Sequence, residues 1–254
     1  MNLQGQVAVV TGASGGLGSP IAKALAAHGA SVACQDIADG VEATAEAIGA
    51  AGGPQAAAYV CDVSDSAAVD AMFADVDRRW GRVDVLVNNA GVGRTPGDGR
   101  DEADDAPLIT RMTDSGWQRI IDVNLNGAFY CARAAVRRMA PAGRGSVINM
   151  SSISGLTGIG VIHYSTTKAG LLGFTRQLAA DLGPFGIRVN AVCPGVIDTP
   201  MIEGVDVERL RAMTPLGRIG VPDDVTGAVL YLASDDSSFT TGQWLSPNGG
   251  IFMG

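Results

Sequence analysis

Short apolar runs alternate with amphipathic stretches from one end of the chain to the other. The apolar runs are rich in Val, Ile and Ala and lie at 7–11, 31–34, 59–62, 83–88, 146–151, 188–192 and 243–246. Stretches with helical periodicity lie between them, at about 19–28, 40–51, 65–80, 115–140, 163–183 and 222–234. Strands that alternate with helices form βαβ units, in which helices cover both faces of a parallel sheet. The pattern therefore predicts one α/β domain over 1–254, a doubly wound, mainly parallel sheet of seven strands.

Two segments interrupt this alternation. Residues 93–107 read GRTPGDGRDEADDAP, which has no periodicity and predicts an acidic loop inserted after the fourth strand. A solvated loop is favoured for this insert over a place at the substrate mouth or at a subunit contact. The second segment, 196–215, follows the sixth strand and contains a short helix-like piece. Loops at the carboxyl edge of open α/β sheets form ligand sites, so we expect a substrate-side loop or lid here.

Composition excludes several classes of function. Hydrophobic residues make up 46% of the chain and charged residues 17%, which is typical of a folded globular protein. The net charge of -8 argues against nucleic acid and against anionic membrane surfaces as partners. The four cysteines form no C-x-x-C pair, so no metal site or redox pair is indicated. With no signal-peptide pattern and no apolar run long enough to span a bilayer, the sequence predicts a soluble cytoplasmic protein.

A glycine-rich turn follows the first predicted strand and leads into a helix. Residues 11–18 read TGASGGLG, with glycines spaced as Gly-x-x-x-Gly-x-Gly instead of the common Gly-x-Gly-x-x-Gly. Glycines let the backbone approach a pyrophosphate, whose charge is stabilised by the free N–H groups at the helix start. The alternative is a tight strand-to-helix connection without a ligand. The turn predicts a dinucleotide site that includes Gly12, Ser14, Gly16, Leu17 and Gly18.

Acidic residues follow the second and third predicted strands. Asp36 lies about twenty residues after the glycines, where a carboxylate can accept a hydrogen bond from a ribose 2′-hydroxyl and repel a 2′-phosphate. Because the flanking Gln35 and Ile37 are not basic, NAD is favoured over NADP. Asp36 as a simple turn residue is the alternative. Asp62 and Val63 follow the third strand and are placed either to contact the adenine or to cap a turn.

A tyrosine and a lysine stand four residues apart in the sequence His163–Lys168. The chain has only two lysines, Lys23 and Lys168, and its other basic residues are mostly arginines, so a lysine at this position is unusual for the chain. Residues four apart share one face of a helix, and a neighbouring cation favours the phenolate of a tyrosine. Tyr164 and Lys168 are therefore candidates for proton transfer, with a surface tyrosine beside a solvated lysine as the alternative. For His163, a structural or exposed role is favoured over contact with substrate.

Five motifs occur in an order that resembles the classical short-chain dehydrogenase/reductases. They are residues 11–18, the Asn-Asn-Ala-Gly run at 88–91, Asn124, Ser151–Ser152 and Tyr164-x-x-x-Lys168. The resemblance covers essentially the whole chain and implies a single Rossmann-like domain. The run PGVIDTP at 194–200 resembles the segment that lies beside the nicotinamide in this family.

The resemblance also implies roles for individual residues. Tyr164 would be the general acid/base, Lys168 would lower its pKa and bind the nicotinamide ribose, and Asn124 would hold a water that joins Lys168 to solvent. Three of the implied positions have a structural alternative: Asn124 as a polar residue of a helix, the run 88–91 as a plain turn, and Thr199 as the cap of a helix. Further cofactor contacts are expected at Asn89, Ala90, Gly91, Pro194, Gly195, Ile197 and Thr199.

The catalytic serine is open to two assignments. In the family it usually lies thirteen positions before the tyrosine, which is Ser151, whereas the sequence after the strand matches the family at Ser152. Ser152 is preferred, because a one-residue deletion in 156–163 would account for the count. Adjacent residues on an extended segment point to opposite sides, so only one of the two faces the substrate.

These observations predict an NAD-dependent oxidoreductase that interconverts a small-molecule secondary alcohol and a ketone. The alternatives are an NADPH-dependent oxoacyl-type reductase of the same family and a non-catalytic dinucleotide-sensing protein. The helices at 115–140 and 163–183 resemble the subunit-contact helices of the family, which implies a homo-oligomer, a tetramer or a dimer. The variable loops predict a largely apolar substrate face made by Ile159, Val161, Ile162, Val196, Met201 and Ile202.

Overall fold

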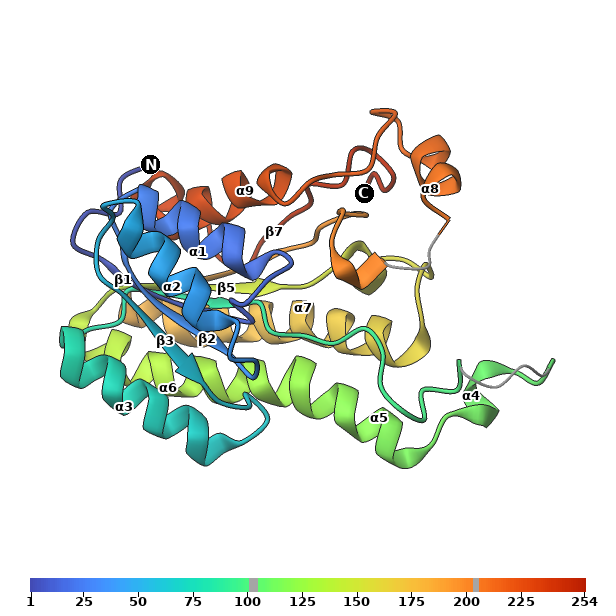
Figure 1. Ribbon diagram of the computed structural model, residues 1–254, viewed down its shortest axis with the longest axis horizontal. Helices are drawn as coiled ribbons and strands as arrows, with labels where there is room; N and C mark the ends of the chain where they lie inside the picture. The colour runs from blue at the N-terminus through green and yellow to red at the C-terminus, as the bar shows by residue number, and fades with distance from the viewer. Residues whose placement is uncertain (101–104, 203–205) are drawn as a thin grey trace.

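A computed structural model describes residues 1–100, 105–202 and 206–254 (Figure 1). Its centre is one parallel sheet with the strand order β3-β2-β1-β4-β5-β6-β7. The predicted fold class is confirmed, since every neighbouring pair of strands is parallel. The strands are β1 Val7–Thr11, β2 Ser31–Asp36, β3 Ala56–Val60, β4 Val85–Asn88, β5 Gly145–Met150, β6 Ile187–Val192 and β7 Trp244–Leu245.

Helices cover both faces of the sheet, as a doubly wound fold requires. One face packs against α1 Gly18–Ala27, α2 Val41–Ala50 and α9 Asp223–Ala233. The other face packs against α3 Ser66–Trp80, α6 Gly127–Ala142 and α7 Ile162–Leu182. All five residues of β1 are buried, which explains why the apolar runs show no alternation of polar and apolar positions.

Two predicted elements differ from the structure. The third strand was predicted at 59–62 but spans Ala56–Val60, because the Asp62 carboxylate accepts hydrogen bonds from the backbone and hydroxyl of Ser64 and forms a turn there. The helix predicted at 115–140 is interrupted. It consists of α5 Asp114–Ile121, a π-helical segment η1 Asp122–Asn126, and α6. A π-helical turn adds a residue to the helix and often marks a functional position.

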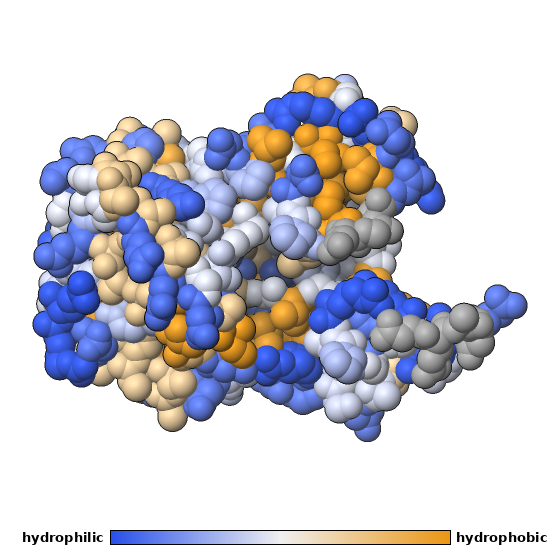
Figure 2. All heavy atoms as spheres, in the orientation of Figure 1, coloured by the Kyte–Doolittle hydropathy of each residue, from blue (hydrophilic) through white to orange (hydrophobic). Residues whose placement is uncertain are grey.

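The remaining described elements are short and lie outside the sheet. They are α4 Leu108–Arg111, η2 Ile153–Gly155, η3 Gly183–Phe185, η4 Pro200–Ile202, α8 Val207–Met213 and η5 Asp235–Ser237. Strand order reverses between β1 and β4, and ligands of open α/β sheets bind at such a point. Figure 2 shows the molecule hollowed on one side, between the lobe that carries η4 and α8 and the lobe that carries α4 and α5. Within the described ranges, no helix is long and apolar enough to cross a membrane.

Candidate active site

A cavity of about 1100 Å³ opens at the carboxyl ends of the strands and extends from the loop after β1 to Tyr164. It gathers residues from most of the chain, and two predicted site residues, Gly18 and Asn124, lie outside its lining. The predicted residues that do line it are Gly12, Ser14, Gly16, Leu17, Asp36, Asp62, Val63, Asn89, Ala90, Gly91, Ser152, Tyr164, Lys168, Pro194, Gly195, Ile197 and Thr199.

The glycine loop forms one end of the cavity. Gly16 has φ +53°, a left-handed conformation that favours glycine. Gly18 supports the loop from behind, because a Cβ there would lie 1.9 Å from the Gly12 carbonyl oxygen. The N–H groups of Gly18 and Ser19 at the start of α1 donate to the Gly15 carbonyl at 3.0 and 3.3 Å, whereas those of Gly16 and Leu17 have no acceptor among the described residues and are available to an anion. This arrangement fits a pyrophosphate.

Asp36 lies at the end of β2 and faces this loop. Its Oδ2 accepts hydrogen bonds from the backbone N–H of Ser14 at 3.0 Å and from the Ser14 hydroxyl at 2.7 Å. Its Oδ1 accepts from the Ala38 N–H at 3.1 Å. The carboxylate is thus fixed at the cavity wall, where it has capacity left for a sugar hydroxyl.

Asp62 lines the cavity from the turn after β3. Arg119 of α5 donates to its Oδ2 from Nη1 at 3.1 Å and also donates to the Ser64 hydroxyl at 3.0 Å. Burial alone would raise the pKa of Asp62, but the hydrogen bonds from Ser64 and Arg119 lower it below its usual range. Arg119 itself lines the cavity and was missed in the sequence, where it looks like any arginine of a helix.

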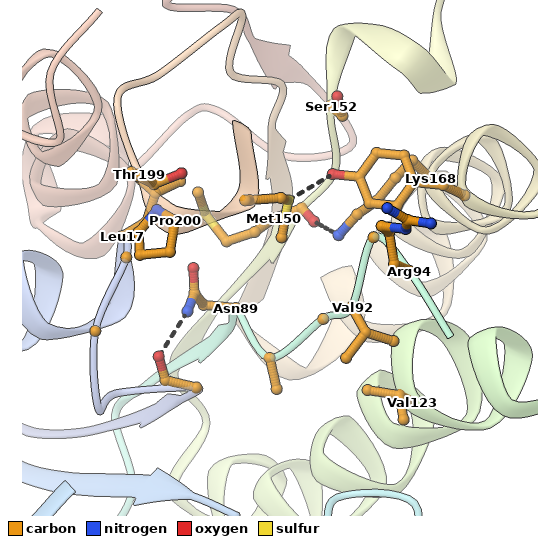
Figure 3. Close-up of a pocket in the computed structure, with 18 of the residues that line it drawn as sticks. Leu17, Asn89, Val92, Arg94, Val123, Met150, Ser152, Lys168, Thr199 and Pro200 are labelled. Atoms are coloured by element: carbon orange, nitrogen blue, oxygen red, sulfur yellow. Dashed lines mark hydrogen bonds between the residues drawn. The ribbon is translucent and has the colours of Figure 1, made fainter. Parts of the chain in front are cut away.

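The Asn-Asn-Ala-Gly turn after β4 is held against the glycine loop. The Thr11 hydroxyl accepts from the backbone N–H groups of Asn89 and Ala90 at 3.0 and 2.9 Å. The Asn89 amide donates to the carbonyl oxygens of Thr11 and Gly12 at 2.9 and 3.1 Å (Figure 3). These contacts join the first and fourth strands at the reversal of strand order.

Lys168 is buried beside the turn. Its Nζ donates to the Met150 carbonyl at 2.7 Å (Figure 3) and lies 5.4 Å from the centroid of the Tyr164 ring. Burial lowers the pKa of Lys168 to about 8. Asn124, in η1, binds the chain after the turn: its Oδ1 accepts from the Val92 N–H at 2.8 Å and its Nδ2 donates to the Val92 carbonyl at 3.0 Å.

Tyr164 is half-buried and lines the cavity, and its hydroxyl lies 3.9 Å from the Met201 sulfur. Burial is the largest influence on the pKa of Tyr164 and raises it, whereas a hydrogen bond with Ser152 lowers it. The lysine ammonium donates to the Met150 carbonyl in this arrangement, and its role in lowering the pKa of Tyr164 stays a prediction.

The two candidate serines have different surroundings. The Ser151 hydroxyl donates to the Lys168 carbonyl at 2.7 Å and is thereby used to attach β5 to α7. The Ser152 hydroxyl accepts from the Ser154 N–H at 3.1 Å and interacts with Tyr164. Both serines line the cavity.

Part of the insert after β4 folds onto the cavity. Asp98 is fully buried, and its Oδ2 accepts from Arg100 Nε and Nη2 at 3.0 and 2.6 Å. Burial alone would raise the pKa of Asp98, but the bonds from Arg100 and from backbone N–H groups lower it to about 2. Gly93, Arg94 and Arg100 line the cavity. The expectation of a solvated loop is therefore wrong for Thr95, Asp98 and Gly99, which are buried, whereas Arg94, Pro96, Asp105 and Pro107 are exposed and 101–104 lie outside the described residues.

His163 connects the insert to α7. It is fully buried, and its Nε2 lies 3.8 Å from Asp98 Oδ2, beyond hydrogen-bond distance. Burial lowers the pKa of His163, so the ring is neutral at physiological pH. The histidine does not line the cavity among the described residues, in agreement with a structural role.

Comparison with known proteins assigns the chain to a family. A family model described as enoyl-(acyl carrier protein) reductase matches residues 12–251. The chain belongs to the short-chain dehydrogenase/reductase family. It is 39% identical over 260 residues to the (2S)-[(R)-hydroxy(phenyl)methyl]succinyl-CoA dehydrogenase subunit BbsD of Thauera aromatica, with 100% of both chains covered. It is 36% identical over 258 residues to the 3-oxoacyl-[acyl-carrier-protein] reductase FabG of Escherichia coli, again with 100% of both covered.

A solved structure of the same family agrees with this fold. The 3-oxoacyl-[acyl-carrier protein] reductase of Brucella melitensis with bound NAD is 36% identical, and the match has a TM-score of 0.88 and covers 100% of this chain and 95% of that one. The protein is thus an oxidoreductase of a family that uses NAD or NADP, as the sequence motifs predicted.

The short-chain dehydrogenase/reductase motifs did not reveal the whole lining. Six residues were predicted to make an apolar substrate face. Met201 and Ile202 line the cavity, whereas Ile159, Val161, Ile162 and Val196 lie outside its lining. Arg94 and Arg100, which both lie within ion-pair distance of Asp98, also line this end, and the prediction of a largely apolar face had not included them. The other lining residues that were not predicted are Gly15, Gln35, Ile37, Val92, Gly93, Arg119, Val123, Met150 and Pro200.

Proposed function

We propose that this protein is an NAD-dependent oxidoreductase that interconverts a secondary alcohol and a ketone. One observation carries the proposal: Tyr164, Lys168 and Ser152 line the same cavity as the glycine loop. A proton-transfer group and a dinucleotide site that share a cavity can act on one carbon, which hydride transfer requires.

The residues present fit NAD. The backbone of Gly12, Gly16 and Leu17 would hold the pyrophosphate, and Asp36 would accept from a ribose hydroxyl. A 2′-phosphate beside the Asp36 carboxylate would be repelled. Arg119 lines the same cavity, but Asp62 and Ser64 already hold its guanidinium. The Brucella melitensis relative, whose structure contains NAD, supports the same choice.

The proposed chemistry divides between the protein and the cofactor. NAD, when bound, accepts the hydride that leaves the carbinol carbon. The Tyr164 phenolate takes the proton of the substrate in the oxidative direction, and the hydroxyl so formed returns a proton in the reductive direction. The Ser152 hydroxyl holds the substrate oxygen beside Tyr164, which keeps the reacting groups aligned.

Lys168 has two proposed tasks. Its ammonium would bind the ribose hydroxyls next to the nicotinamide, and its charge would favour the phenolate of Tyr164. Since burial raises the pKa of Tyr164 in the structure described here, this help is needed for proton removal near neutral pH. Asn124 would hold the turn at Val92 and a water that links Lys168 to solvent.

A second candidate is a reductase of oxoacyl thioesters. It is favoured by the Escherichia coli relative, which matches over its full length and is named for that reaction. The fixed carboxylate of Asp36 opposes the NADPH dependence that was predicted for this alternative. A clear preference for a 3-oxoacyl thioester with NADPH would replace the leading proposal.

The proposal is tested with a panel of secondary alcohols, supplied with NAD and separately with NADP. The absorbance of the reduced nicotinamide reports turnover in each case. We expect turnover of at least one alcohol with NAD and a lower kcat/KM for NADP with the same alcohol. Tight NAD binding without turnover of any alcohol, ketone or thioester would instead support a dinucleotide-sensing protein.

We also propose a homo-oligomer, a tetramer or a dimer, in which α6 and α7 form contacts. Phe129 of α6 exposes 44% of its surface in the single chain, which is unusual for a phenylalanine in a helix. Light scattering of the wild type and of Phe129→Glu would show whether this face is covered.

A further inference from the structure

We infer that Arg119 recognises the purine base of the cofactor, and that Asp62 does not bind the 6-amino group of adenine. The inference rests on the proposed function, since it concerns how NAD is held. It starts from the ion pair between Arg119 of α5 and Asp62 of the turn after β3, two residues that line the cavity.

Hydrogen bonds within the protein already occupy the carboxylate of Asp62. Its Oδ1 accepts from the backbone N–H of Ser64 at 2.8 Å and from the Ser64 hydroxyl at 2.7 Å. Its Oδ2 accepts from Arg119 Nη1 at 3.1 Å and from Nη2 at 3.2 Å. A carboxylate has about four lone-pair positions, and these bonds from the described residues use them. Asp62 therefore holds its own turn and Arg119, and an amino group of a base would have to displace one of these donors.

Arg119 is held by one edge of its guanidinium and keeps a second edge. Besides its bonds to Asp62, Nη1 donates to the Ser64 hydroxyl at 3.0 Å. Within the described ranges, Nε and the second N–H of Nη2 have no acceptor. These two groups belong to one edge, and such an edge can donate to two acceptors of a planar base. Because the ion pair orients the side chain in advance, binding a base costs Arg119 little further freedom.

The residues around Arg119 fit the adenosine half of the cofactor. Asp36, proposed to bind the ribose, pairs with Val60 in the sheet, so the turn at Asp62 begins two residues beyond this pair. The base is attached to that same ribose and would lie between the ends of β2 and β3. Ile37 lines the cavity here, is exposed and offers an apolar surface to a ring.

This arrangement predicts which atoms of the base are recognised. Arg119 only donates hydrogen bonds, so it binds ring nitrogens and carbonyl oxygens and does not favour an amino group. Hypoxanthine carries a carbonyl oxygen at the position where adenine carries its amino group. The wild-type protein should therefore bind NAD and nicotinamide hypoxanthine dinucleotide with similar affinity. A carboxylate that is free to accept would instead favour adenine and oppose the carbonyl oxygen of hypoxanthine.

Calorimetry of the wild-type protein with the two dinucleotides tests this prediction without any turnover. We expect the dissociation constant of the hypoxanthine dinucleotide to exceed that of NAD by less than about fivefold, which is below the usual effect of one hydrogen bond to a charged group. Tighter binding of the hypoxanthine dinucleotide would agree equally well with a donor at Arg119. A larger preference for NAD would show that Asp62 binds the amino group and would overturn the inference.

Removal of the arginine should create the selectivity that the wild type lacks. Arg119→Met leaves Oδ2 of Asp62 free, so the affinity for the hypoxanthine dinucleotide should fall about tenfold relative to that for NAD. Arg119→Lys keeps a cation beside Asp62 without the planar edge, and should shift the ratio in the same direction by a smaller factor. Equal losses of affinity for both dinucleotides in the two variants would indicate a purely structural role and refute the assignment.

A double variant attributes the new selectivity to Asp62. Asp62→Asn combined with Arg119→Met should bring the ratio of dissociation constants back toward that of the wild type, because an amide can donate as well as accept. A ratio that stays at the Arg119→Met value would contradict the inference. Arg137→Met is the matched control, since Arg137 is an exposed helical arginine that pairs with Asp70 outside the cavity lining. It should leave both affinities unchanged.

Failure of this inference is distinguishable from failure of the proposed function. If NAD binds and is reduced by an alcohol while the hypoxanthine dinucleotide binds far more weakly, the oxidoreductase proposal stands and only the role of Arg119 is lost. If neither dinucleotide binds, the proposed function itself has failed.

Discussion

The two ends of the cavity are built by different means. At the cofactor end, the glycine loop, Asp36 and the turn at Asn89 sit directly on the ends of β1, β2 and β4, and backbone groups supply most of the contacts. At the substrate end, the insert and η4 lie outside the sheet, and the side chains of Asp98 and Arg100 determine the shape of the wall. Tyr164 lies where the two ends meet.

The cofactor end is built in a way that does not depend on the substrate, whereas the substrate end is built for a specific substrate. Backbone groups at strand ends bind a phosphate whatever the neighbouring side chains are, so that end can serve many substrates. The substrate end depends on a few long side chains, and single substitutions there should change selectivity with little effect on cofactor binding. The experiments below test this separation.

The largest effect is expected at the junction. Tyr164→Phe removes the proton donor but keeps the ring, so turnover should fall by ~10²–10⁴-fold, the usual contribution of a general acid/base. The affinity for NAD, measured by calorimetry, should change less than about twofold because the glycine loop and Asp36 are untouched. Turnover equal to the wild type would remove Tyr164 from the mechanism.

A comparison of Ser152→Ala with Ser151→Ala tests which of the two serines acts at the substrate end. Ser152→Ala should lower kcat by about 10²-fold, as expected for the loss of a donor to the reacting oxygen. Ser151→Ala loses the bond to the Lys168 carbonyl, so it should lower the free energy of unfolding by about 1 kcal/mol with a smaller effect on kcat. The reverse order of kcat values would assign catalysis to Ser151.

The cofactor end is tested by Asp36→Ala. Removal of the carboxylate should reduce the ratio of kcat/KM for NAD to that for NADP by about tenfold to a hundredfold, because repulsion of the 2′-phosphate and a bond to the ribose are both lost. Asp39→Ala is the matched control, since Asp39 is exposed in the same loop and outside the cavity lining. A wild-type enzyme that already prefers NADP would contradict the assignment of Asp36.

Most of the cofactor end could be predicted because its determinants are local in sequence. A strand, a glycine turn and a helix follow one another at 7–27, and Asp36 ends the next strand as expected. Gly18 illustrates a limit of this reasoning. Its place in the motif predicted a contact with the cofactor. In the structure, the absence of a side chain at Gly18 allows α1 to pack against Gly12.

The substrate end could not be predicted, because contacts between distant residues decide it. The acidic composition of 93–107 suggested a solvated loop, yet Asp98 is buried through its bonds to Arg100 and its packing on His163. The composition of a segment shows which of its residues are charged, but it does not show which of these charges form ion pairs. The π-helical turn that carries Asn124 likewise has no signature in the periodicity of 115–140.

The smallest effect on catalysis is expected from Asp98→Asn, which removes a charge at the substrate end alone. Loss of the charge should lower the free energy of unfolding by roughly 1–3 kcal/mol, a range kept low because Arg100 is partly exposed to water. The KM for substrate should rise a few-fold, whereas the affinity for NAD should not change. Asp105→Asn, at an exposed carboxylate of the same insert, should leave all three quantities unaltered.

The pH dependence of this stability difference provides an independent check. The pKa of Asp98 is lowered to about 2 in the folded protein, so its charged form stabilises the fold above about pH 4. As the pH falls from about 4 toward 2, the unfolded chain binds the proton first and the advantage of wild type over Asp98→Asn should shrink. The difference in the free energy of unfolding between wild type and Asp98→Asn is measured by chemical denaturation. Both proteins are compared at pH 7, at pH 4 and at the lowest pH where they remain folded. A difference that stays constant would mean that packing, and not the charge of Asp98, holds the insert against α7.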